Sequence, residues 1–60
     1  MITITIEQFE EAQENQSGFC IACGEEADGV EPDAHEYTCD HCNTNNVYGA
    51  EELLLMGRVT

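Results

Sequence analysis

The feature that most constrains this 60-residue chain is a repeated Cys-x-x-Cys motif, which supplies Cys20 with Cys23 and Cys39 with Cys42. Two intervening residues let both thiolates of a pair point to one side of a tight turn. Their separation then suits a tetrahedral ion with Zn–S distances of about 2.3 Å. The four cysteines are therefore predicted to bind one structural zinc ion.

The residue after each second cysteine supports this prediction. Turns of this kind often need a positive φ, which glycine adopts freely and asparagine tolerates better than most residues. The residues at these two places are Gly24 and Asn43. Both pairs thus carry the same turn chemistry, which a chance pair of cysteines would not share.

Chain length makes such a cross-link necessary. A chain this short buries too little apolar surface to fold comfortably by packing alone, and it usually needs a disulfide, a metal or a partner. We expect one domain over residues 1–60, a small metal-stabilised α+β fold. It would contain two Cys-x-x-Cys knuckles, short β-strands, an N-terminal helix and a short C-terminal helix.

Other uses of the cysteines remain open. Two disulfides would suit an oxidising compartment, and four thiolates also suit a mononuclear iron centre, although iron sites of that kind are usually wrapped in aromatic residues. A redox-active Cys-x-x-Cys would need a βαβ context, and no such pattern is found. Each of His35 and His41 could replace a cysteine, but four thiolates already complete a tetrahedron.

Net charge narrows the range of partners. Thirteen carboxylates face a single basic side chain, Arg58, and the formal net charge is -12. Binding to nucleic acid requires clustered Lys and Arg that displace counterions, and anionic membrane surfaces repel the same charge. We therefore expect neither direct nucleic-acid binding nor membrane binding. Residues 1–6 lack the basic start and apolar core of a signal peptide, which predicts a cytoplasmic location.

Local patterns predict the elements. Alternation in residues 1–6 predicts a strand, and Thr5 with Gln8 fits a capping box for a helix that begins near Ile6. Its inner face would hold Ile6, Phe9, and Ala12 or Gln13, and Gly18 would end it. We further expect a loop over 25–36, a strand at 37–38, a positive-φ turn at 45–46 and an extended segment at 47–48. A helix over 50–56 would stop at Gly57, and 58–60 would pair with residues 1–6.

Several segments resemble a known class of metal proteins. The knuckles Cys20-Ile21-Ala22-Cys23-Gly24 and Cys39-Asp40-His41-Cys42-Asn43 resemble those of zinc-ribbon (rubredoxin-like) domains. The stretches 29–34 and 47–54 are similar to small zinc-ribbon proteins of bacterial and prophage genomes. This resemblance implies a fold and a bacterial or phage setting. It implies no activity, because the motif is specific for metal and not for function.

The surface predicts binding rather than catalysis. A closed four-thiolate site leaves no position for water, so no enzyme is expected. We expect an acidic protein-interaction module, for example a phage or bacterial regulator or inhibitor that docks on the basic surface of a nucleic-acid-binding protein. Exposed leucines on the short C-terminal helix would suit an interface or a homodimer. The alternatives are an iron-containing electron-transfer protein and an accessory subunit of an enzyme complex. The candidate contacts are Glu7, Glu10, Glu11, Glu14, Glu25, Glu26, Asp28, Glu31, Leu54 and Leu55.

Overall fold

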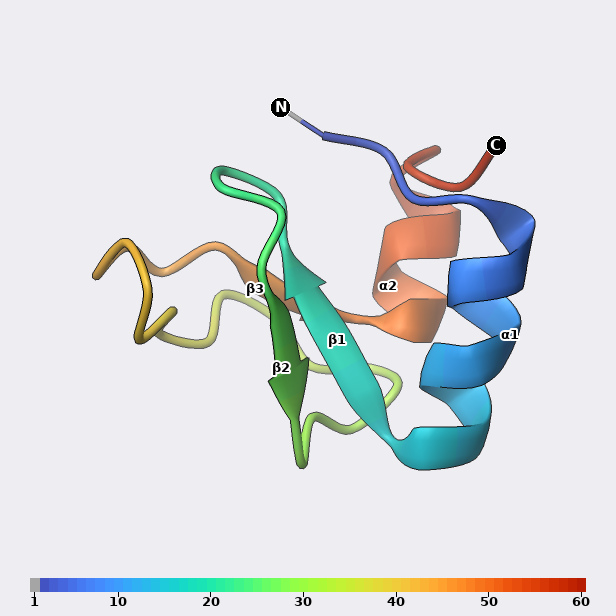
Figure 1. The fold of residues 1–60 in the computed structure, drawn as a ribbon, viewed down its shortest axis with the longest axis horizontal. Coiled ribbons are helices and arrows are strands. Elements are labelled where there is room, and N and C mark those ends of the chain that lie inside the picture. Colours follow the sequence, from blue (N-terminus) through green and yellow to red (C-terminus); the bar gives the residue numbers. More distant parts are fainter. Residues whose placement is uncertain (1) are drawn as a thin grey trace.

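The computed structural model describes residues 2–60 and contains two helices beside one small sheet (Figure 1). The sheet has the order β2-β1-β3, and β1 pairs antiparallel with both neighbours. The two helices contact each other and β1. The predicted α+β class is confirmed. In chain order the elements are α1 (Ile6–Asn15), β1 (Ser17–Cys20), β2 (Glu26–Asp28), β3 (Val47–Gly49) and α2 (Ala50–Leu55).

Helix α1 begins where the capping box predicted. The Thr5 side chain accepts a hydrogen bond from the Gln8 backbone, and the Gln8 side chain accepts one from the Thr5 N–H. The predicted end at Gly18 is wrong, because Gln16 adopts the left-handed conformation that closes the helix. Gly18 instead lies inside β1, where a Cβ atom would collide with the carbonyl oxygen of Tyr48. This glycine is needed for close packing of β1.

The inner face of α1 is narrower than expected. Ala12 is buried and Phe9 is half-buried, but Ile6 is 53% exposed and Gln13 is exposed. At about 100° per residue, Ile6 lies about 120° from Ala12 around the helix axis. Ile6 therefore lies at the border of the buried side, and its predicted inward position is wrong.

The region between the knuckles is more ordered than a loop. Residues 26–28, which lie within the predicted loop over 25–36, form β2. The predicted strand at 37–38 is reduced to one bridge between Tyr37 and Val47. The predicted positive φ at 45–46 is also wrong. In residues 2–60 the positive-φ residues other than glycine are Gln16, Glu36 and Asn43.

The two ends of the chain lie side by side, as predicted. Ile4 and Val59 form a parallel bridge, and the Ile4 carbonyl accepts the N–H of Thr60. No longer strand forms over residues 2–6, and the part of that prediction that concerns Met1 lies outside the described residues. Termination at Gly57 agrees with its φ of 74°.

The central sheet separates two apolar clusters. Side chains alternate along a strand, so Phe19 and Tyr48 face the helices, whereas Cys20 and Val47 face the other side. The first cluster also holds Leu53 from α2. The second includes Cys20 and Cys39, so two of the predicted ligands belong to the core.

Candidate metal centre

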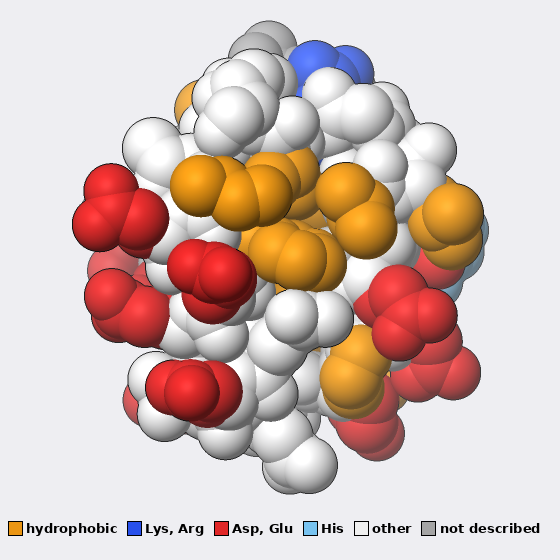
Figure 2. Space-filling model, turned by 90° about the vertical axis from the view of Figure 1, so that its right-hand side faces the viewer, with side chains coloured by type: hydrophobic (Ala, Val, Ile, Leu, Met, Phe, Trp, Pro, Cys, Tyr) orange, Lys and Arg blue, Asp and Glu red, His pale blue; other side chains and the backbone are white. Residues whose placement is uncertain are grey.

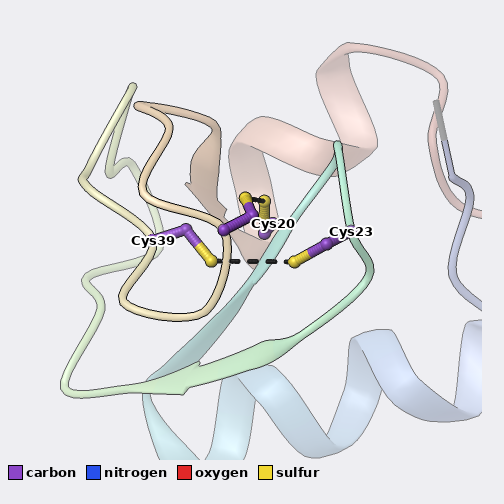
Figure 3. A group of neighbouring side chains, drawn as sticks. Cys20, Cys23 and Cys39 are labelled. Atoms are coloured by element: carbon purple, nitrogen blue, oxygen red, sulfur yellow. Dashed lines mark hydrogen bonds between the residues drawn. The ribbon is translucent and has the colours of Figure 1, made fainter.

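The two knuckles bring all four cysteine sulfurs together. Their Sγ atoms lie within 4.8 Å of one another, and Figure 3 shows Cys23 and Cys39 pointing toward each other. The Sγ atoms of Cys20 and Cys42 are 3.6 Å apart, and those of Cys23 and Cys39 are 3.7 Å apart. A tetrahedral ion with bonds of about 2.3 Å to sulfur needs S···S separations of about 3.8 Å. The four cysteines are therefore positioned to bind a metal ion.

The same geometry disfavours disulfides as the resting arrangement. All four cysteines are free thiols, and the two shortest S···S distances far exceed an S–S bond of about 2.05 Å. Each of these pairs also joins one knuckle to the other. One ion bound by all four sulfurs would therefore link the two halves of the site.

Matching backbone hydrogen bonds build the two knuckles. The carbonyl of Cys20 accepts the N–H of Gly24 at 2.8 Å, and the carbonyl of Cys39 accepts that of Asn43 at 2.8 Å. The N–H of Cys20 donates to Glu25 at 2.9 Å, and that of Cys39 donates to Thr44 at 2.8 Å. Each first cysteine is thus fixed by the residues four and five places later.

The turn residues behave as their chemistry predicted. Gly24 has a φ of 84° and Asn43 a φ of 59°. Both lie in the left-handed region that glycine and asparagine tolerate. The local sequence therefore determines how each knuckle closes.

One feature distinguishes the knuckles. The Oγ1 of Thr44 lies 3.1 Å from the Sγ of Cys42 and accepts a hydrogen bond from the Asn46 amide at 2.9 Å. Because the hydroxyl accepts from Asn46, its own proton is free to point at the sulfur. The equivalent residue of the first knuckle, Glu25, offers only its backbone N–H to Cys23.

This difference separates the proton affinities of the second cysteines. The hydroxyl and then the backbone N–H of Thr44 lower the pKa of Cys42 to about 6, although desolvation opposes them. The Glu25 N–H acts to lower the pKa of Cys23, but desolvation and hydrogen bonds with the other thiols raise it to about 12. Cys42 therefore loses its proton at a lower pH than Cys23 does.

Sequence reasoning missed the role of Thr44. The prediction used the residue directly after each knuckle, whereas Thr44 lies one place further on. A hydroxyl residue two places after a ligand is a weak signal, because threonine there is equally common in turns. The contact depends on the second knuckle's turn and on Asn46, and these become evident only in the fold.

Neither histidine belongs to the cysteine cluster. His41 is exposed within the second knuckle, as expected. His35 lies elsewhere, with its Nδ1 3.4 Å from a carboxylate oxygen of Glu52 and its ring in a T-shaped contact with the ring of Tyr48. Within residues 2–60, the only group of three or more possible metal ligands is the cysteine set.

The other predicted contacts fall into two regions. The four α1 glutamates, Glu7, Glu10, Glu11 and Glu14, are all exposed and line one shallow depression. Glu25, Glu26 and Asp28 line another, beside Cys39. Glu31 lies apart from both and accepts a hydrogen bond from the Tyr37 hydroxyl at 2.9 Å. On α2, Leu54 is 48% exposed and Leu55 is 77% exposed.

No family model, curated protein or solved structure matches this chain. Across residues 2–60, no helix has both the length and the hydropathy needed to cross a membrane.

Proposed function

We propose that this chain is a non-catalytic protein-interaction module whose fold is stabilised by one structural zinc ion. The observation that carries the proposal is the closed group of four sulfurs at tetrahedral spacing. Four protein ligands fill a zinc coordination sphere, whereas catalytic zinc keeps one position for water. The metal therefore has a structural role, and the function resides on the surface.

The donor set favours zinc, with iron as the alternative. Thiolates select zinc and iron among the common metals. Cys20 and Cys39 pack in one apolar cluster with the small side chains of Val30, Ala34 and Val47. No aromatic residue belongs to this cluster. That environment differs from the aromatic wrapping expected around an iron electron-transfer centre. We also propose a zinc-ribbon fold of the kind found in bacterial and prophage proteins, because the two knuckles resemble those of that class.

Charge indicates the nature of the partner. Four thiolates and one Zn²⁺ lower the formal charge from -12 to -14, because four protons leave and two positive charges arrive. A protein with a basic surface, such as one that normally holds nucleic acid, has the complementary charge. Association with such a partner is fast and sensitive to salt. Nucleic acid itself is not the expected partner, because the chain has a single basic side chain, Arg58.

Native mass spectrometry tests the metal. We expect one zinc ion per chain and a solution that is colourless in the visible region. An absorption spectrum typical of a ferric tetrathiolate would show that the bound metal is iron and would favour the electron-transfer alternative. Retention of the fold and the melting temperature after chelation would contradict a structural role for any metal.

Purification of the tagged chain from its host tests the interaction. We expect a protein with a basic surface to co-purify and to be released by salt. The control is a chain with Glu7, Glu10 and Glu11 changed to Gln, which keeps the side-chain size and removes charge. Recovery of the same protein with both chains at low salt would mean that the acidity serves solubility alone. Co-purification of enzyme subunits would support the accessory-subunit alternative.

A further inference from the structure

The helices leave an apolar surface without a partner. Figure 2 shows hydrophobic side chains gathered on the face that carries α1, with carboxylates on two sides of them. The helices' exposed large apolar residues include Ile6 and Leu54, and Phe9 is half-buried between core and surface. We call Ile6, Phe9 and Leu54 the helical face.

Helix geometry places carboxylates at the margin of this face. Around α1, Glu10 lies about 40° from Ile6, on the side away from Phe9, and Glu14 lies about 80° from Ile6. On α2, Leu53 is completely buried and Leu54 lies about 100° from it, whereas Leu55 lies about 160° away. Leu54 therefore lies at the border of the buried side of α2, and Leu55 is turned away from the core.

A second copy of the chain does not suit this surface. A two-fold interface brings each patch against itself. The acidic margins would then face each other in two molecules that each carry a formal charge of -12. Like charges opposed across an interface cost several kcal/mol. The favoured occupant has apolar residues bordered by Lys or Arg.

Helices α1 and α2 contact each other, so a third helix that lies against both completes a three-helix arrangement. Helices pack by fitting ridges into grooves, and amphipathic helices are commonly recognised through apolar residues at i, i+3, i+4 and i+7. Helix α1 has ten residues and is about 15 Å long, which matches about three turns of a partner helix. The length of α1 and the carboxylates at the margin of the helical face thus fit an amphipathic helix that carries basic residues.

We propose that the helical face binds a cationic amphipathic helix of another protein. The apolar side of that helix covers Ile6, Phe9 and Leu54, and its basic residues lie against Glu10 and Glu14. This inference rests on the proposed function and names the surface and the partner's form. The acidic depression beside Cys39, lined by Glu25, Glu26 and Asp28, lies outside the helical face.

The experiment uses the zinc-loaded full chain and a Leu/Lys helical peptide of about two heptads. Its control is a scrambled peptide of the same composition, which keeps the charge and loses the apolar side. We expect the ordered peptide to bind at least about tenfold more tightly than the scrambled one. Amide chemical shifts should change in α1 and α2 and stay constant at residues 25–28.

Two matched variants test whether peptide binding depends on the location of a carboxylate or only on the net charge of the chain. Glu10→Lys and Glu25→Lys change the net charge equally, but only the first lies at the helical face. We expect about a tenfold loss of peptide affinity in Glu10→Lys and less than about twofold in Glu25→Lys. Leu54→Glu should also lower the peptide affinity by about tenfold, and Leu55→Glu should lower it by clearly less. Each variant must keep one zinc ion and the wild-type circular dichroism.

Several results would overturn the inference. Equal losses in the two lysine variants, equal binding of both peptides, or shifts confined to residues 25–28 would each do so. A dimer of the free chain that Leu54→Glu dissociates would assign the face to a second copy. A host partner released by salt but indifferent to Leu54→Glu would remove this inference and leave the proposed function standing.

Discussion

The two knuckles have the same backbone and different surroundings. Both first cysteines are buried and make equivalent hydrogen bonds. The first knuckle directly follows the central strand β1 and leads into β2. The second lies outside the three-stranded sheet, between the Tyr37–Val47 bridge and β3, and its turn is held by side chains, including a Thr38–Asn45 hydrogen bond of 3.0 Å.

This contrast shows two ways to position a ligand. The sheet fixes the first knuckle through backbone pairing, so its second cysteine needs no side-chain support. The second knuckle instead uses the Asn46–Thr44–Cys42 chain of hydrogen bonds, which orients a sulfur and lowers its pKa together. The two knuckles therefore differ in the groups that surround the cysteines. Groups of this kind commonly orient the ligands of a metal and change its affinity.

Loss of a buried ligand should have the largest effect. Cys20→Ser and Cys39→Ser each remove a thiolate from the core and should abolish tight zinc binding and cooperative thermal unfolding. Zinc binding supplies much of the folding free energy in domains of this size. Calorimetry and metal analysis check both. If only Cys39→Ser unfolded the chain, the sheet alone would be holding the first knuckle in place.

The turn residues should differ in their tolerance. Gly24→Val forces a β-branched residue to positive φ and should cost about 1–3 kcal/mol of unfolding free energy. Space is not the cause, because the nearest atom to an added Cβ is a methyl group of Ile2 at 3.8 Å. Asn43→Gly keeps the turn and should change stability by less than about 0.5 kcal/mol. Chemical denaturation measures both, and equal losses would contradict the positive-φ argument.

Thr44→Val should weaken zinc binding by about 10–100-fold, the usual effect of removing a partner of a ligand. The matched variant is Glu25→Gln, which leaves the backbone N–H toward Cys23 in place. Its zinc affinity should stay near the wild-type value. Competition with a chromophoric chelator gives both constants. Similar losses in the two variants would show that the hydroxyl has no special role.

The smallest effect should be a shift in the pH of zinc release. The folded pKa of Cys42, about 6, is below the ordinary 9.0, so its thiolate stabilises the folded state fully above pH 9. That contribution is lost as pH falls through about 6. Thr44→Val raises this pKa, so protons should displace zinc at higher pH than in the wild type. An acid titration with a zinc indicator shows the midpoint, and an unchanged midpoint would contradict the assignment.

Local chemistry predicted the parts of the fold that depend on neighbouring residues. The capping box, both positive-φ turn residues and the Gly57 stop are short-range features that appear in the sequence. Two of the misplaced features depend on distant contacts. Gly18 resembled a helix terminator, but it is needed because Tyr48 crosses close to it. Strand β2 was hidden because its acidic residues have low strand propensity and gain order only by pairing with β1.

The sequence predicted which cysteines form the candidate site, but not the groups that change their pKa values. Cysteine spacing alone identified the four sulfurs that the fold brings together. The unequal pKa values of Cys42 and Cys23 follow from the Thr44 hydroxyl, from desolvation and from hydrogen bonds among the thiols, none of which the ligand motif shows. The exposed position of Ile6 was missed for a similar reason. A helical pattern defines an apolar side, but the neighbouring elements determine how much of it is covered.

The parallel bridge between the chain ends has a mechanical consequence. Residues 2–6 and 58–60 run in the same direction, joined by hydrogen bonds from Ile4 to Arg58, from Thr60 to Ile4 and from Ile6 to Thr60. Stretching the chain from its two ends would pull these segments past each other along their length. All three hydrogen bonds would then bear the load together, instead of opening one after another. The junction would therefore resist extension as a shear clamp and protect the core, in which the two knuckles bring four cysteines together.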